Sequence, residues 1–344
     1  MFGKKKAIVG LDIGSSQIKV VELTGYPKAT SILKVGIAPL LPDAIVDGEV
    51  MDREVVIDTI KTLFEKFAIQ AKDVVTAISG RGVIVKKIAM DKMKRSDVQE
   101  QIRWEAEQHV PFDIDNVSLA FEIVNPDAGE GQMEVLLVAA KSEVVNSYMS
   151  LIKEIGLNPV VLDIASFAVQ NVYEYNYPVL PDKLVALVTI GSEITNISFI
   201  INNVNHFTRD VFSATNSCSQ KIQRELGVNR AQAEQLIRGE DVEGIGSESV
   251  DKFFQEFAEE VAVGLDKVIP FLPGEKEKID RIVLCGGGAL IRGLVDYLKS
   301  RFDTEVIVIN ALQNIKYDPA IFAEDRPEKI SPVIAEAVGL ALRG

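Results

Sequence analysis

The spacing of apolar and polar residues near the start of the chain predicts a hairpin. An apolar run over 7–11 enters as a buried strand, and apolar residues recur over 18–23 on the returning strand. The residues that shape and flank the turn are small or polar: Asp12 at the end of the first strand, Gly14, Ser15, Ser16 and Lys19. A tight turn of this kind presents backbone N–H groups to an anion, and a lysine adds a charge-assisted contact. The hairpin is therefore either a phosphate-binding turn or the ordinary start of a domain.

The pattern continues in a way that predicts an α/β unit. Residues 31–39 form a third expected strand, residues 53–67 carry an apolar stripe at helical spacing, and residues 74–79 return as a strand. Residues 160–164 and 166–175 then supply a further strand and its crossover helix.

Between these segments, residues 82–157 read as a small inserted α+β subdomain. Ser96 and Gln99 form a capping-box pattern at its first helix, and Pro111 ends that helix by removing a backbone donor. The expected strands and helices of the insertion cover 83–90, 96–110, 117–124, 133–140 and 142–155.

The second half of the chain repeats its opening. VGLDIGS at 9–15 matches LVTIGS at 187–192 when Asp12 is set against Thr189. Strands over 184–190, 196–201 and 204–211 follow the same order, with an Asn202–Asn203 turn. This repetition indicates two duplicated lobes around a central cleft.

A third glycine-bearing turn lies in the second lobe. A strand over 281–285 runs into Gly286, Gly287 and Gly288, and we expect a helix over 291–302 to follow directly. Such a turn lets a ligand approach the backbone at a helix N-terminus, although glycines at strand–helix turns are common. The remaining expected helices cover 217–226, 230–238, 248–271 and an alanine-rich closing helix with Gly339 over 332–342.

Composition and charge argue against several classes of partner and of catalytic site. The formal charge of −13 argues against a nucleic-acid partner, and the short basic run over 4–6 is too small for stable membrane anchoring. Two cysteines in 344 residues predict a reducing, intracellular compartment. The sequence has no apolar stretch long enough to predict insertion into a membrane. His109 and His206 lack neighbouring ligand-type residues, which argues against a zinc or histidine-dependent catalytic site.

The three turns in this order resemble the actin, hexokinase and heat-shock ATPase superfamily. The resemblance implies an α/β fold with duplicated actin/heat-shock ATPase-like (ribonuclease H-like) lobes and an inserted α+β subdomain in the first. The implied division is 1–81, 158–178 and 332–344 for the first lobe, 82–157 for the insertion, and 179–331 for the second lobe. Within this superfamily, the cell-division protein FtsA carries its insertion at about this place.

Three stretches resemble the PilM family of type IV pilus assembly proteins. They are IRWEAEQHVPFDIDNVSLAFEIV over 102–124, GSSQIKVVEL over 14–23 and the terminal AVGLALRG over 337–344. FtsA continues past the closing helix into a linker and an amphipathic membrane helix. This sequence shows no such tail before Gly344, which favours PilM and predicts recruitment to the inner membrane through partners.

The resemblance implies ATP and Mg²⁺ as ligands. It places cofactor-binding residues at Asp12, Gly14, Ser15, Ser16, Lys19, Gly191, Glu234, Gly286, Gly287 and Gly288. Asp12 would hold Mg²⁺ through water, and no catalytic residue is assigned.

The second lobe departs from the family pattern. Thr189 stands where a carboxylate usually faces magnesium, which weakens the hold on the ion. Ala214–Thr215 replaces a glycine pair, and Ile237 replaces a lysine beside Arg238. The site is therefore either a degenerate one that binds ATP and hydrolyses it slowly or not at all, or one that has lost nucleotide binding.

The resemblance also implies a partner, the N-terminal peptide of a PilN-like membrane protein, and contacts with pilus motor ATPases and the platform protein. Candidate groove residues are Val83, Ile84, Val85, Ile102, Trp104 and Glu105. For Trp104, an anchor in the core of the insertion is the competing interpretation.

Three classes of function follow: an ATP-responsive adaptor, a small-molecule kinase of the same superfamily, and a self-associating, filament-forming cytoskeletal protein. Binding of the partner peptide, phosphorylation of a substrate, and ATP-dependent polymers would distinguish them. Thr189 disfavours the kinase, which needs a carboxylate.

Overall fold

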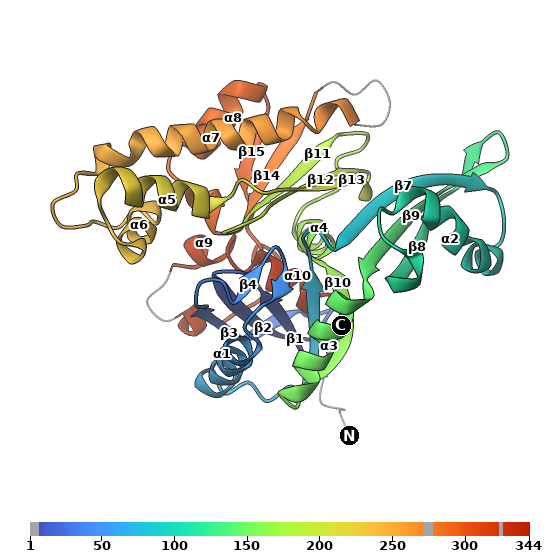
Figure 1. Cartoon of the computed structure of the whole chain (residues 1–344), viewed down its shortest axis with the longest axis horizontal. Coiled ribbons are helices and arrows are strands. Elements are labelled where there is room, and N and C mark those ends of the chain that lie inside the picture. Colours follow the sequence, from blue (N-terminus) through green and yellow to red (C-terminus); the bar gives the residue numbers. More distant parts are fainter. Residues whose placement is uncertain (1–6, 272–277, 323–325) are drawn as a thin grey trace.

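The computed structural model describes residues 7–271, 278–322 and 326–344, so the basic run over 4–6 lies outside it. Two five-stranded sheets have equivalent orders, β3-β2-β1-β6-β10 and β13-β12-β11-β14-β15 (Figure 1). In each, three antiparallel strands are followed by two parallel ones, which confirms the predicted actin-like duplication. The strands are β1 (Ile8–Ile13), β2 (Gln17–Thr24), β3 (Ser31–Pro39), β6 (Asp73–Ile78), β10 (Asn158–Ile164), β11 (Val185–Ile190), β12 (Thr195–Ile201), β13 (Val204–Val211), β14 (Arg281–Cys285) and β15 (Glu305–Val308).

Helices lie between the sheets and on their outer faces. Alternate residues of β11 belong to different cores, because both faces of the strand are buried. The central helices, α4 (Ala165–Asn176) and α10 (Ala335–Ala341), share a core with strands of both sheets. The outer helices are α1 (Arg53–Lys66) and α3 (Ser142–Glu154) on the first lobe, and α5 (Thr215–Leu226), α6 (Arg230–Ile237), α7 (Asp251–Asp266) and α8 (Leu294–Phe302) on the second.

Two glycines allow α10 to approach the first lobe closely. A Cβ on Gly10 of β1 would lie 1.9 Å from the Ala337 carbonyl oxygen. A Cβ on Gly339 would lie 1.8 Å from the Ala168 carbonyl oxygen of α4. The closing helix therefore packs backbone to backbone beside the strand that carries Asp12, and it begins three residues later than predicted.

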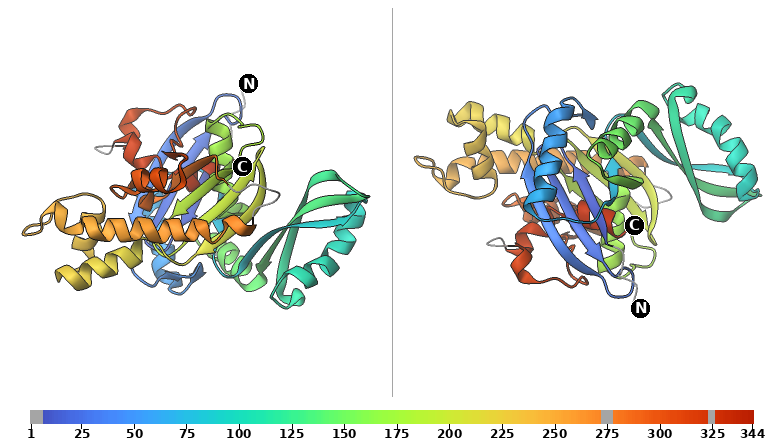
Figure 2. Two further views of the ribbon diagram at one scale, coloured as in Figure 1. Left: turned by 90° about the horizontal axis from the view of Figure 1, so that it is seen from above. Right: turned by 90° about the horizontal axis from the view of Figure 1, so that it is seen from below.

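The insertion has its own sheet and core and projects to one side of the lobes (Figures 1 and 2). It comprises β7 (Val83–Asp91), α2 (Arg95–His109), β8 (Val117–Gly129) and β9 (Gln132–Lys141). The helix α3, which the sequence places in the insertion, instead buries Val144, Tyr148, Leu151 and Ile152 in the core of the first lobe.

Several local expectations are wrong in detail. The capping box at α2 is not formed: Lys94 takes the cap position, and the Ser96 hydroxyl bonds to the Asp97 carboxylate at 3.0 Å. The short strands β4 (Ile45–Val46), β5 (Glu49–Val50) and β15 were not expected, because a few residues carry little periodicity. The remaining short elements are η1 (Ile114–Asn116), η2 (Ser247–Val250), η3 (Ile269–Phe271), η4 (Gly287–Leu290), η5 (Pro319–Phe322) and α9 (Pro327–Ile330).

Candidate functional site

The first turn joins β1 and β2 and holds an ion pair between a buried aspartate and a half-buried lysine. Asp12 lies inside β1 instead of ending it, and its Oδ2 is 3.1 Å from Nζ of Lys19, its cross-strand partner. The backbone N–H of Gly14 donates to the Gln17 carbonyl at 3.1 Å. A Cβ on Gly14 would lie 3.2 Å from Lys19 Nζ, so glycine leaves the lysine accessible beside the turn. Ser15 and Ser16, at the tip, are half-buried.

The second turn repeats this geometry without its charges. The N–H of Gly191 donates to the Ile194 carbonyl at 3.0 Å, and Thr189 pairs across the strands with Asn196. In the same register, Thr189 therefore replaces Asp12 and Asn196 replaces Lys19. The second lobe offers neither the carboxylate nor the ammonium of the first.

Helix α5 begins against this second turn. The Thr215 backbone N–H and hydroxyl both donate to the Gly191 carbonyl, at 3.2 and 3.1 Å. The N–H of Asn216 donates to the Ser192 carbonyl at 2.8 Å. These two N–H groups at the start of α5 are therefore engaged by protein carbonyls.

The third turn uses its glycines in two ways. Cβ atoms on Gly286 and Gly288 would lie 2.4 and 2.2 Å from atoms of Ile190, so both allow the turn to pack on β11. Gly287 is exposed, with no atom within 4 Å of the position of a Cβ. The regular helix begins only at Leu294, beyond η4, so the expected helix N-terminus is not at the glycines.

A glutamate that the sequence reading missed lies near the first turn. Burial, and then the negative charge of Asp12, raise the pKa of Glu336 on α10, while Lys19 lowers it. Burial also raises the pKa of the Asp163 and Asp210 carboxyls. Glu336 is the one acidic residue of an alanine-rich apolar helix. Because such a helix faces a core, its carboxyl is expected to be buried, and this was the sequence signal that could have identified it.

Glu234, the expected ribose or base contact, lies on α6 and is engaged within its own helix. Its Oε1 accepts from Arg230 Nε at 2.8 Å. Burial raises the pKa of Glu193, at the tip of the second turn. The positive charge of Arg230 opposes this rise, so the two side chains are close. Helix α6 therefore lies within electrostatic reach of the second turn.

Two side chains of the first turn have the chemistry that binding of Mg-ATP requires. Lys19 is a half-buried cation beside the turn, and Asp12 is a carboxylate of the kind that could hold Mg²⁺ through a water molecule. Among the described residues, no group of three potential metal ligands exists. Magnesium tolerates this because it commonly keeps several waters and takes phosphate oxygens with one or two carboxylates.

The six candidate partner residues are not brought together on one surface. Val83 and Val85 pack toward the core of the first lobe, whereas Ile84 packs on that of the insertion. Ile102 is buried in the insertion, and Glu105 is half-buried. Trp104 is 70% exposed on α2, so the core-anchor interpretation is wrong.

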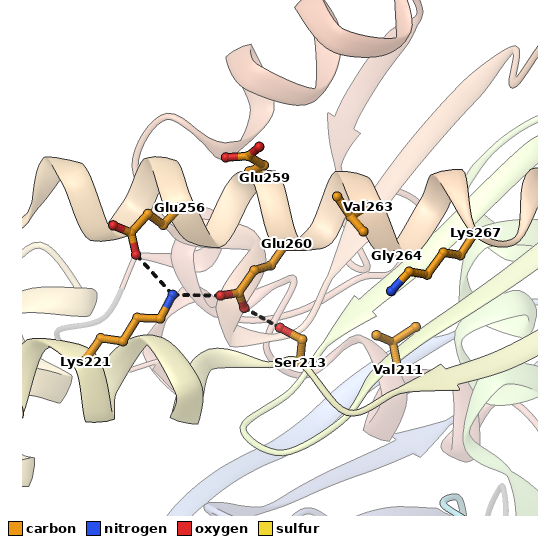
Figure 3. A pocket seen from close by; sticks show the side chains of 9 residues that line it. All are labelled: Val211, Ser213, Lys221, Glu256, Glu259, Glu260, Val263, Gly264 and Lys267. Atoms are coloured by element: carbon orange, nitrogen blue, oxygen red, sulfur yellow. Dashed lines mark hydrogen bonds and ion pairs between the residues drawn. The ribbon is translucent and has the colours of Figure 1, made fainter.

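Two cavities lie away from these turns. One, of about 520 Å³, lies between β13, α5 and α7 (Figure 3). In it, Lys221 Nζ lies 3.0 Å from Glu256 Oε2 and 2.8 Å from Glu260 Oε1. The other, of about 750 Å³, is lined by Tyr26, Val160 and Arg343 among others at the edge of the first lobe. Neither is lined by a residue predicted to bind nucleotide.

Comparison with known proteins decides the family. The family model described as type IV pilus assembly protein PilM matches residues 10–344. The chain belongs to the PilM family. A chain of a solved structure titled PilM-PilN type IV pilus biogenesis complex is 28% identical, with a TM-score of 0.87 and 98% of each chain covered.

More distant structures share the fold with this PilM-family chain. The ethanolamine utilization protein EutJ of Carboxydothermus hydrogenoformans has a TM-score of 0.59 at 16% identity, over 100% of this chain and 91% of that one. MreB5 of Spiroplasma citri bound to AMPPNP has a TM-score of 0.56 at 12% identity, over 97% and 94%. Within the described ranges, no helix is both long and apolar enough to cross a membrane.

Proposed function

We propose that the chain is an ATP-binding adaptor of the type IV pilus assembly machine, which binds the N-terminal tail of a PilN-like membrane protein. The observation that carries the proposal is the match, over 98% of both chains, to a structure of a PilM–PilN complex. A small-molecule kinase and a filament-forming protein are not favoured by these comparisons.

The partner surface is expected on the insertion and its junction with the first lobe. Trp104 is the strongest single candidate, because exposed tryptophans are frequent anchors of protein interfaces and this one is 70% exposed. Glu105, the next residue of α2, is half-buried and completes the proposed surface, whereas Val83, Ile84 and Val85 of β7 pack on two different cores and are left out of it.

A calorimetric titration with a synthetic PilN-like N-terminal peptide tests this role. We expect binding, weakened about tenfold or more by Trp104→Ala. Val179→Ala is the matched control, because Val179 is 48% exposed and lies outside the insertion. Absence of binding both with and without Mg-ATP would reject the adaptor proposal.

The nucleotide is proposed to lie between the three turns. When bound, Mg-ATP would supply a phosphate-bound cation, which residues of the first turn would hold. Lys19 would contact a phosphate, Asp12 would orient a magnesium-bound water, and Gly287 would leave room for the adenosine. Because the second turn lacks a carboxylate at Thr189, we propose slow hydrolysis or none.

Finer parts of the role follow from the same proposal. A cytoplasmic protein held at the inner membrane by its partner would couple that partner to the pilus motor ATPases and the platform protein. Self-association of the chain is the last part of the proposal, and light scattering with and without ATP would test it.

A further inference from the structure

The linker between the first lobe and the insertion is bonded to the second lobe. Residues 79–82 join β6 to β7, and the backbone N–H of Gly80 donates to Asp210 Oδ2 on β13 at 2.9 Å. The other oxygen of Asp210 accepts from Asn196 Nδ2 at 2.7 Å. Both oxygens of this buried carboxylate are therefore engaged, one within the second lobe and one across to the linker.

Asn196 connects this carboxylate to the second turn. It pairs with Thr189 on one side and with Asp210 on the other, so the three residues form one row across β11, β12 and β13. The carboxylate in the same row as Thr189, that of Asp210, thus lies two strands away and is bonded to the linker.

Further contacts fix the linker at its sides. The Arg81 guanidinium lies over the Phe212 ring of the second lobe, 4.3 Å from its centroid, and pairs with Asp47 of the first at 3.4 Å. The N–H of Asp47 donates to Glu193 Oε2 at the tip of the second turn, at 3.3 Å. Gly80 is required here, because its φ is +92° and a Cβ would lie 2.2 Å from the Asp47 carbonyl.

The insertion itself contacts the same strand. Lys87 Nζ on β7 lies 2.6 Å from Glu134 Oε1 of the insertion and 3.1 Å from Nδ1 of His206 on β13. One end of β13 therefore holds the linker, and the other end holds the body of the insertion.

We propose that β13 couples the second turn to the insertion, so that a nucleotide phosphate at the turns changes how the insertion is held and thereby its affinity for a partner peptide. The inference rests on the proposed function and adds its regulation. The coupling elements are the Asn196–Asp210–Gly80 row and the Lys87–His206 contact. A ligand that shifts the second turn must strain or move these bonds, because both carboxylate oxygens of Asp210 already accept hydrogen bonds within the row.

The test measures the linkage between two ligands. The dissociation constant of the PilN-like peptide is measured with and without saturating Mg-AMPPNP, in wild type and in Asp210→Asn, Asp210→Ala and Lys87→Met. We expect the nucleotide to change the wild-type constant at least fivefold, on the order of typical coupling between sites, and to change it less than about twofold in the variants. Thr208→Val is the control: it lies on the same strand and removes a contact to Ser198 within the second lobe.

A second readout does not depend on peptide binding. Spin labels on Gln101→Cys of α2 and Gln255→Cys of α7, both exposed, report the distance between insertion and second lobe, and both native cysteines are buried. We expect Mg-AMPPNP to shift the distance in wild type and Thr208→Val, and expect no shift in Asp210→Ala. An unchanged distance in wild type with nucleotide bound, or wild-type coupling in Asp210→Ala, overturns the inference. Failure of the peptide to bind at all would instead count against the proposed function.

Discussion

At the scale of single residues, the two lobes use the same backbone turn with different chemistry. Asp12 and Lys19 form an ion pair, whereas Thr189 and Asn196 occupy the equivalent positions without charge. The repeat VGLDIGS and LVTIGS predicts the replacement of Asp12 by Thr189, whereas the replacement of Lys19 by Asn196 follows only from the strand register. It does not predict Asp210 or Glu336, because both become relevant only when the sheet register and the docking of α10 bring them near the turns.

Lys221 offers a residue-scale prediction for stability. Hydrogen bonds from Lys221 and Ser213 lower the pKa of Glu260 in spite of burial, so Lys221→Met removes a stabilising partner. We expect the free energy of unfolding at pH 7 to fall by about 1 kcal/mol, a modest value because both side chains are about one-third exposed. Lys267→Met is the matched control, since Lys267 lines the same cavity and forms no ion pair with other described residues.

The difference in free energy of unfolding between wild type and Lys221→Met is expected to shrink as the pH falls. A carboxyl with a lowered folded-state pKa stabilises the fold above its unfolded value, which is near 4.5, and this stabilisation is lost as the pH falls through the folded-state value. Urea unfolding should therefore show the gap between wild type and Lys221→Met closing at acid pH. A gap that is as large at pH 3 as at pH 7 would contradict the assignment to this ion pair.

At the scale of elements, the three glycines after β14 have different roles: two allow the turn to pack on β11, and one leaves space for a ligand. Gly286 and Gly288 are needed for contact with Ile190, whereas Gly287 faces open space. A glycine triplet alone predicts a close approach of backbone to something, but it does not say whether a neighbouring strand or a ligand is approached. The same limit explains why the helix was expected directly after the glycines: η4 and Gly293 intervene.

Two alanine substitutions test this separation. Gly288→Ala places a Cβ against the buried Ile190 side chain and should lower the free energy of unfolding by at least about 1–3 kcal/mol. Gly287→Ala should leave thermal stability nearly unchanged and weaken Mg-ATP binding, as thermal melts and calorimetry would show. Equal losses of stability in both variants would refute the distinction.

At the scale of the whole molecule, the fold and its family were predictable and the interlobe contacts were not. The succession of strands along the chain, the duplicated turns and the insertion follow from periodicity and repetition. The actin-like fold and the family were instead implied by the resemblance of particular stretches to known families. The placement of α3 on the first lobe and the contacts of β13 with residues 80–87 depend on how separate units dock. Nothing in the local pattern of residues 204–211 marks that strand as the contact between second lobe and insertion.

The charged half of the proposed nucleotide site lies in the first lobe, and titration of Mg-ATP by calorimetry tests this claim most directly. Wild type should bind, Lys19→Ala should bind at least about tenfold more weakly because a charge-assisted contact is lost, and Thr189→Asp should bind more tightly in a magnesium-dependent way. Folded Lys19→Ala protein that binds Mg-ATP with wild-type affinity, or Thr189→Asp with unchanged affinity and turnover, would contradict the account.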